Sequence, residues 1–189
     1  MGEMTTQLRS AELAAAGAES SQYLTFYVTG ERYAIAILDV QEIIEIAQIT
    51  RVPMTPDYIK GVINLRGNVV PVVDLCARLG RDCSEVTKRS CIVLVEVGRE
   101  QDQDGQVIGM LVDEVNEILE IPPDHLQPPP DFGTDIRTDF IQAMGRVDDQ
   151  FLVLLDISHV LSIEELAGVQ RVAEHAELPP ADAAGQPEA

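Results

Sequence analysis

The chain has 189 residues, 46% of them hydrophobic, which suits one or two small domains with buried cores. Its formal net charge of −19 repels phosphate backbones and anionic lipid headgroups, which argues against a nucleic-acid-binding protein. Three cysteines, no apolar leader and no apolar run of about 20 residues argue against a secreted disulfide framework or a membrane span. We therefore expect a cytoplasmic protein with no nucleic-acid partner and no direct membrane insertion.

The two ends of the chain differ in composition from its middle. Residues 1–21 are rich in Ala, Glu and Ser, and residues 167–189 contain Pro, Ala and Glu without a strand pattern. Neither end can bury enough apolar surface to offset the entropy of ordering the chain. We expect a flexible N-terminal extension over 1–21, one structured domain over 22–166, and a disordered C-terminal tail over 167–189.

Short β-branched runs separated by turn residues fill the structured part, with turns at Thr29-Gly30, at Gly67-Asn68 and over Gln101–Gly105. Many short antiparallel strands predict small barrels or sandwiches. Pro71 has no N–H to donate, so its strand is expected at a sheet edge or a bulge.

Two short helices and a rigid connection complete the predicted elements. One helix follows Asp74 as LCARLG, and the other covers residues 157–166. The pair Pro122-Pro123 and the run Pro128–Pro130 predict a rigid, extended connection late in the domain.

An internal duplication divides the domain. Three pairs of similar segments occur in the same order: YLTFYV (23–28) with CIVLVEV (91–97), VQEIIEI (40–46) with VNEILEI (115–121), and VPVVDL (70–75) with LVLLDI (152–157). Such self-similarity is a signal at the level of the fold. It predicts two related β-rich halves, about 22–85 and 86–166, with their boundary between Gly80 and Arg89.

The most informative segment is PMTPDYIKGVINLRGNVVPVVDL, residues 53–75. It predicts a strand, a turn at Arg66-Gly67 and a second, nearly all-apolar strand, with the donors of Asn64, Arg66 and Asn68 at the tip. The matching turn of the second half is expected at Gly145-Arg146. An apolar hairpin with a polar tip suits contact with a partner and offers no obvious catalyst.

This segment resembles the signature of the CheW-like coupling proteins of bacterial chemotaxis, and the resemblance extends from Tyr23 to Leu166. It implies a mainly β fold of two SH3-like five-stranded β-barrels packed together, with a few short helices and a hydrophobic core between the barrels. It also implies a non-catalytic adaptor without a cofactor. Such an adaptor couples the cytoplasmic tip of a methyl-accepting chemotaxis receptor to the regulatory domain of a CheA-type histidine kinase. It controls the kinase's autophosphorylation at receptor arrays on the inner face of the membrane.

The resemblance also implies a set of partner-binding residues: Val40, Glu42, Lys60, Gly61, Asn64, Arg66 and Gly67. The chain departs from the family at Cys76, where an arginine is usual, and in its C-terminal extension. The residues alone leave other interpretations open. In one of them, Arg66 pairs with Asp74 or Glu42 and only fixes the hairpin. In the others, Val40 is a core residue, and Gly61 and Gly67 only permit a positive φ or the close approach of strands.

Catalytic and metal sites find little support in the sequence. His125, His159 and His175 fall in unrelated segments, and Cys76, Cys83 and Cys91 form no C-x-x-C pair. Asp102, Asp104 and Gly105 match only part of a calcium loop. We therefore expect no catalytic, cofactor or metal site. Two alternatives stay open: a coupling protein of a non-flagellar pathway, such as one for type IV pili, and an enzyme using carboxylates in a pocket.

Overall fold

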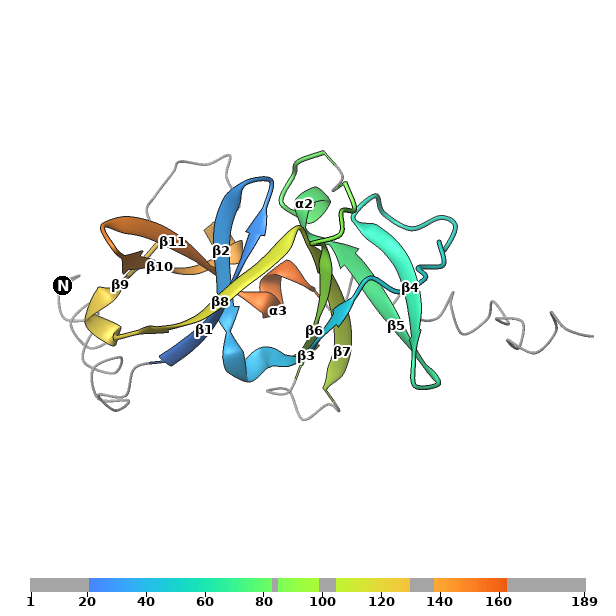
Figure 1. The fold of residues 1–189 in the computed structure, drawn as a ribbon, viewed down its shortest axis with the longest axis horizontal. Coiled ribbons are helices and arrows are strands. Elements are labelled where there is room, and N and C mark those ends of the chain that lie inside the picture. Colours follow the sequence, from blue (N-terminus) through green and yellow to red (C-terminus); the bar gives the residue numbers. More distant parts are fainter. Residues whose placement is uncertain (1–20, 83–84, 99–104, 130–137, 163–189) are drawn as a thin grey trace, which may run out of the picture.

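The computed structural model describes residues 21–82, 85–98, 105–129 and 138–162. The predicted C-terminal tail and all but Ser21 of the predicted N-terminal extension lie outside these residues. Within them the chain forms eleven strands and a few short helices, and Figure 1 shows two β units side by side. The mainly β fold predicted from the sequence is confirmed.

The strands form two sheets. Sheet A has the order β8-β1-β2-β11-β10-β9, and sheet B has the order β3-β6-β7-β5-β4. The strands of sheet A are β1 (Ser21–Val28), β2 (Glu31–Ala36), β8 (Glu114–Ile121), β9 (Leu126–Gln127), β10 (Ile141–Val147) and β11 (Gln150–Leu155). Those of sheet B are β3 (Val40–Glu45), β4 (Ile59–Leu65), β5 (Asn68–Asp74), β6 (Cys91–Val97) and β7 (Gln106–Val112).

The two sheets do not follow the expected division of the chain near residue 85. Hairpin β1–β2, from the first half, lies in sheet A with β8 to β11, and hairpin β6–β7, from the second half, lies in sheet B with β3 to β5. The halves have exchanged their first hairpins. Sequence similarity identifies related strands but carries no information about which copy each one pairs with.

The exchange preserves the duplication as an internal pseudo-twofold symmetry. Replacing β3, β6, β7, β5 and β4 by their counterparts β8, β1, β2, β11 and β10 converts the order of sheet B into that of sheet A without its additional edge strand β9. Even the single parallel pairing recurs, as β5 with β7 and as β11 with β2. Each residue of β4 and β5, and of the helix that follows, has a counterpart whose residue number is higher by 82. Asp74 and Asp156 are one such pair.

Three apolar clusters hold the strands together. The largest takes buried residues from both sheets, among them Phe26 and Ile35 of sheet A and Val93 and Met110 of sheet B. Two smaller clusters lie within single sheets, one around Ile63 and Val72 and the other around Leu152 and Leu154. Because burial of apolar surface is the main favourable term in folding, the shared cluster joins the two sheets into one body.

Two predictions about turns and edges were wrong. The turn of the second half lies at Asp148-Asp149, and Gly145-Arg146 belongs to strand β10. Pro71 lies in β5, which has neighbours on both sides, and the bulge between β4 and β5 lies at Ile59 to Gly61. The ladder to β7 starts only at Val72, so Pro71 lies just outside it.

The helices are short. Helix α2 (Leu75–Arg78) follows Asp74 as predicted, and α3 (Ile157–Val160) occupies the start of the second predicted helix, whose residues 163–166 lie outside the described part. The described residues also form three single 3-10 turns: η1 (Ile37–Asp39), η3 (Pro123–His125) and η4 (Thr138–Phe140). The prolines before His125 therefore begin a turn, where an extended connection was expected. Proline suits a first helical position because its φ is already fixed there.

Candidate functional site

The candidate site is the tip of the β4–β5 hairpin. Leu65 and Asn68 face each other across a two-residue turn, with φ of 51° at Arg66 and 87° at Gly67. Two positive φ angles match a type I′ turn, whose twist suits the flanking strands. The side-chain Oδ1 of Asn64 accepts the Gly67 N–H at 2.9 Å, which holds the turn closed. The predicted Arg-Gly turn is thus present, and the backbone at its tip is well fixed.

Arg66 reaches from the tip to strand β3. Its Nη2 donates to Glu42 Oε1 at 3.1 Å and to Oε2 at 3.0 Å, and the Arg66 side chain remains 74% exposed. Asp74, the other proposed partner, is fully buried, and its Oδ1 accepts the Cys76 N–H at the start of α2. The Glu42 pair therefore orients the guanidinium while leaving most of its surface open to a partner.

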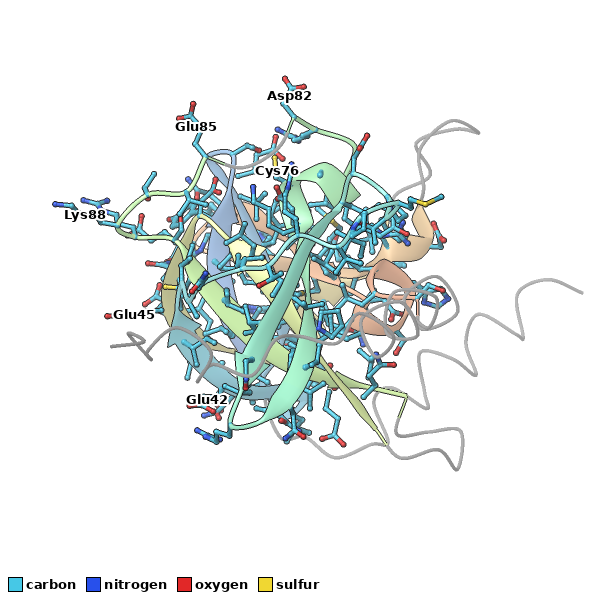
Figure 2. All side chains as sticks on the ribbon, turned by 90° about the vertical axis from the view of Figure 1, so that its right-hand side faces the viewer. Glu42, Glu45, Cys76, Asp82, Glu85 and Lys88 are labelled. Atoms are coloured by element: carbon cyan, nitrogen blue, oxygen red, sulfur yellow. The ribbon has the colours of Figure 1, made fainter. Side chains whose placement is uncertain are left out.

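A shallow hollow of about 530 Å³ lies beside the tip. Its lining combines the guanidinium with amide and apolar side chains: Gln41, Leu65, Arg66, Asn68, Val69, Val70, Gly105, Gln106 and Val107. Gln41 is held in place by donating to Glu96 Oε2 at 2.8 Å. Figure 2 shows Glu42 at one end of this side of the molecule and Asp82 and Glu85 at the other.

The seven predicted residues separate into two groups. Glu42, Asn64, Arg66 and Gly67 come together at the tip. The other three lie elsewhere: Val40 is half-buried against the shared core, and Lys60 and Gly61 lie in β4 at its bulge. This favours the core interpretation of Val40 and a backbone role for Gly61.

Gly61 is needed for packing. Its φ is +149°, and a Cβ there would collide with the carbonyl oxygen of Thr50, which accepts the Val62 N–H at 2.8 Å. Gly67 differs, because its φ of +87° has open space around it. One glycine permits close contact between chain segments, and the other permits the turn.

The sequence analysis missed the lining residues that come from β7. Gln106 and Val107 are far from the hairpin in sequence and reach the hollow only because β7 pairs with β5. The sequence alone contains no signal for them, because Val107 is recognised as the counterpart of Arg32 in β2 only through the sheet registers. Arg32 itself binds Glu117, the counterpart of Glu42, at 3.0 Å.

Cys76, the departure from the family pattern, is fully buried. Its S–H donates to the carbonyl oxygen of Asp82, and the residue belongs to the shared core. It therefore fills space in the interior, as small apolar side chains do.

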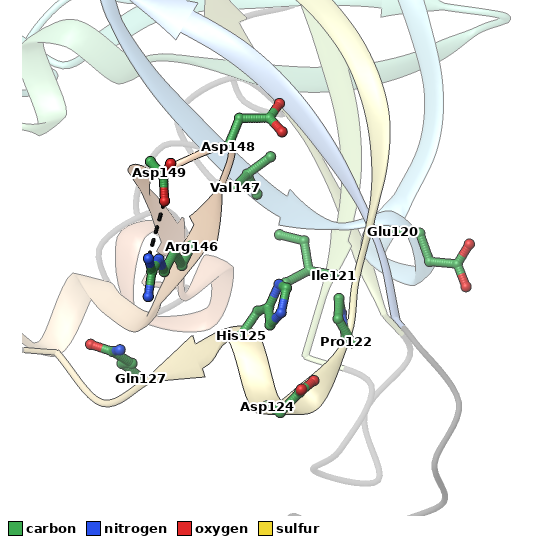
Figure 3. Close-up of a pocket in the computed structure, with 10 residues that line it drawn as sticks. All are labelled: Glu120, Ile121, Pro122, Asp124, His125, Gln127, Arg146, Val147, Asp148 and Asp149. Carbon is green, nitrogen blue, oxygen red and sulfur yellow. Dashed lines mark hydrogen bonds and ion pairs between the residues drawn. The ribbon is translucent and has the colours of Figure 1, made fainter.

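A second hollow, of about 610 Å³, lies beside the Asp148-Asp149 turn. In Figure 3 the side chains of Ile121 and His125 extend into the space between η3 and this turn, while Glu120 points away. Arg146 donates to Asp149 Oδ1 at 3.1 Å along its edge.

The groups with displaced pKa values line neither hollow. Arg81 Nη2 donates to Glu31 Oε2 at 2.6 Å, and this contact, followed by the hydrogen bond from Tyr33, lowers the pKa of Glu31. Burial, followed by that hydrogen bond, raises the pKa of Tyr33 to about 12. Among the described residues no group of three or more His, Cys, Asp or Glu side chains is placed to hold a metal ion.

Comparison with known proteins identifies the family. The model of the CheW-like domain matches residues 22–181. The chain belongs to the CheW-like family. The chemotaxis protein CheW of Klebsiella aerogenes is 35% identical over 153 residues, covering 81% of this chain and 89% of that protein. The probable chemotaxis protein CheW of Rhizobium etli is 32% identical over 144 residues, covering 76% of this chain and 89% of that protein.

The fold agrees with a solved member of the family. The crystal structure of the scaffolding protein TtCheW from Thermoanaerobacter tengcongensis has a TM-score of 0.67 and 32% sequence identity, and the match covers 77% of this chain and 90% of that one. The family, the pair of SH3-like β-barrels and the chemotaxis adaptor role predicted from the sequence are confirmed. No helix within the described residues is both long and apolar enough to cross a membrane.

Proposed function

We propose that this adaptor joins the cytoplasmic tip of a methyl-accepting chemotaxis receptor to the regulatory domain of a CheA-type kinase. The β4–β5 hairpin tip is the proposed receptor contact. Membership of the CheW-like family supports the adaptor role, and the oriented, 74% exposed Arg66 supports this choice of surface. In this account the chain contributes binding and no catalysis, and receptor binding recruits it to arrays at the inner face of the membrane.

The chemistry of the tip suits a helical partner that carries carboxylates and amides. A guanidinium offers several donors in one plane, and the amides of Asn68 and Gln41 beside it add further donors and acceptors. Val69 and Val107 give the hollow an apolar wall. Because the side chain of Glu42 is 39% exposed, Arg66 can exchange part of this ion pair for a partner carboxylate at small cost.

Signal transmission requires unequal binding to two receptor states. A coupling protein with the same affinity for both states would shift no equilibrium. We therefore propose that Arg66 and its hollow contact the receptor differently in its kinase-activating and kinase-inhibiting states. The difference in binding is then transmitted to the kinase through the two packed barrels and changes its autophosphorylation.

A reconstitution tests the adaptor role. Kinase and receptor cytoplasmic fragments are mixed with and without this chain, and kinase autophosphorylation is measured with ligand-free and ligand-bound receptor. We expect receptor-dependent autophosphorylation only when the chain is present. The same rate with and without the chain, across several cognate receptors, would contradict the proposal.

The pathway served by the kinase is a separate question, because a flagellar and a non-flagellar system need the same coupling chemistry. Deleting the coding sequence and scoring swimming and pilus-driven movement separates the two. We propose flagellar control, and a defect confined to surface movement would favour the alternative.

A further inference from the structure

The two short helices meet at the junction between the sheets. Each follows the last strand of its half and begins with an aspartate cap: Asp74 Oδ1 accepts the Cys76 N–H at 3.1 Å, and Asp156 Oδ1 accepts the Ser158 N–H at 3.0 Å. Figure 1 shows α3 in the middle of the molecule and α2 above it, where the two units adjoin. The helices are therefore symmetry counterparts, and the Arg78 side chain of α2 reaches α3 across the junction.

The residues around them are also paired by the pseudo-twofold symmetry. The Asp74 N–H donates to the carbonyl oxygen of Tyr58 at 2.7 Å, and the Asp156 N–H donates to that of Phe140 at 2.8 Å. Tyr58 and Phe140 thus occupy equivalent places, one before β4 and one before β10. By the same spacing, the last residue of α2, Arg78, is the counterpart of Val160 in α3.

Arg78 contacts Tyr58, Phe140 and Val160. Its Cζ lies 4.5 Å from the centroid of the Tyr58 ring and 5.1 Å from that of the Phe140 ring. Its Nε donates to the carbonyl oxygen of Val160, its own counterpart, at 2.7 Å. A side chain that touches both members of one symmetric pair and the counterpart of its own residue lies close to the pseudo-twofold axis.

Only one half can place an arginine there. Two guanidinium groups close to the same axis would face each other and repel, and the other half carries Val160, which is fully buried in the shared core. Arg78 is thus an asymmetric contact at the junction, which the Arg81–Glu31 and Arg89–Glu114 ion pairs also cross nearer the surface. It also differs in kind from the apolar contacts around it, because burial of apolar surface is non-directional, whereas a hydrogen bond and a cation over a ring fix orientation.

We propose that Arg78 is a positioning residue that fixes the angle between the two barrels and so transmits receptor state from the β4–β5 tip to the rest of the adaptor. The transmission step rests on the proposed coupling function, whereas the fixed angle does not. Without Arg78 the shared core still joins the barrels, but the angle between them varies more widely. Binding to one barrel then has a weaker effect on the other.

The first experiment measures the angle in the full chain without any partner. Spin labels are introduced through non-canonical amino acids at Asn68 and Gln150, exposed counterparts that follow the two hairpin turns. Double electron–electron resonance then gives the distribution of distances between them. We expect a broader distribution for Arg78→Met than for the parent, and a partial recovery for Arg78→Lys, which keeps the charge but loses the planar group.

Arg89→Met is the matched control. Arg89 also joins the two sheets, through Glu114 of β8, but it is 76% exposed and its Nη1 lies 3.4 Å from Oε2. We expect its distance distribution to equal that of the parent. A distribution for Arg78→Met as narrow as that of the parent, in protein with unchanged circular dichroism, would overturn the proposal. If Arg78→Met does not fold, Arg78→Lys decides: a parental distribution for Arg78→Lys likewise overturns it.

The second experiment measures transmission in the reconstituted kinase assay. Arg78→Met should bind receptor and kinase separately with parental affinity, while receptor-dependent activation falls by at least about fivefold, the size of a modest allosteric coupling. Activation equal to that of the parent, together with a broadened distance distribution, would overturn the transmission step. A parent chain that gives no activation would instead contradict the coupling function and leave the distance experiment as the test of the fixed angle.

Discussion

The two hairpin tips share a backbone and differ in charge. Both are two-residue turns with positive φ at both positions, 51° and 87° at Arg66-Gly67 and 48° and 60° at Asp148-Asp149. The first carries a cation that reaches across to Glu42 in another strand, whereas Arg146 beside the second pairs locally with Asp149. The duplication thus gives two equivalent turns, and different residues in and beside them give the two tips different charged surfaces.

The difference extends beneath the tips. Glu117, the counterpart of Glu42, is bound by Arg32 of β2, so its side of the molecule needs no arginine in the turn. In sheet B the counterpart of Arg32 is Val107, which leaves Glu42 to the tip arginine. The equivalent carboxylates Glu42 and Glu117 are therefore paired with arginines from non-equivalent positions. Of these two arginines, Arg66 is largely exposed and Arg32 is not.

Reversing the charge at the tip should have the largest effect on function. We expect Arg66→Glu to reduce receptor-dependent kinase activation more than about tenfold, because it replaces the docking cation with a like charge beside Glu42. The matched control, Arg146→Glu, alters the arginine next to the other tip and should retain activation. Kinase assays of both variants make the measurement, and equal losses in the two would show that the tips are not functionally distinct.

Gly61 tests how the first tip is built. Its counterpart in sheet A is Ala143, and both follow a bulge, yet only Gly61 lies against the Thr50 carbonyl. We expect Gly61→Ala to lower the free energy of unfolding by about 2–4 kcal/mol, as overpacking and backbone strain do.

The control is Gly67→Ala, where positive φ is the only obstacle and the expected loss is about 1–2 kcal/mol. Urea denaturation measures both. Equal losses would mean that the close approach of Thr50 does not limit this position.

The pH dependence of stability distinguishes the sheets at a third pair of positions. Tyr33 of sheet A is the counterpart of Ile108, and its pKa is raised from 10 to about 12 by burial and then by Glu31. Because the folded pKa lies above the unfolded one, the neutral phenol stabilises the fold below pH 10. That contribution, about 2–3 kcal/mol, is lost as the pH rises toward 12.

Tyr33→Phe should therefore flatten the stability curve between pH 10 and 12 measured by denaturation of parent and variant. From pH 6 to 8 the two curves should run parallel, because the phenol is neutral there in both states. If the two curves also ran parallel above pH 10, ionisation of Tyr33 would not be the cause of the loss of stability at alkaline pH.

The Arg66–Glu42 pair should contribute least to stability. The Arg66 side chain is 74% exposed and that of Glu42 is 39% exposed, so a double-mutant cycle of Arg66→Met and Glu42→Gln should give a coupling of less than about 1 kcal/mol. The same cycle on Arg32 and Glu117, where Arg32 is only 26% exposed, should give a larger value. A strong coupling at Arg66 would favour the interpretation that this residue mainly fixes the hairpin.

The sequence predicted the local structure of the first tip better than its surroundings. Arg66-Gly67 between two apolar runs specifies its own turn, because the required φ angles and the Asn64 cap are local. The second turn was placed at Gly145-Arg146 because that dipeptide looked similar, although two aspartates adopt the same angles. Aspartate tolerates positive φ more readily than most residues, and the sequence comparison gave that property no weight.

Long-range placement could not be predicted in the same way. The repeats identify related strands, but β1 pairs with β8 and β7 with β5, and no local preference distinguishes these pairings from those within each half. Val107 and Gln106 are part of the candidate site only through that exchange. Arg78 has contacts on both sides of the junction for the same reason, and its neighbours Phe140 and Val160 are far away in the sequence.

The central claim is that the Arg66 tip, and not its counterpart, binds the receptor. Its most direct test is equilibrium binding of a receptor cytoplasmic fragment to two full-length variants, one with Arg66→Asp and Gly67→Asp and one with Asp148→Arg and Asp149→Gly. The account predicts that the first variant loses binding and that the second binds like the parent. Parental affinity in the first variant, with its fold intact by circular dichroism, would contradict it.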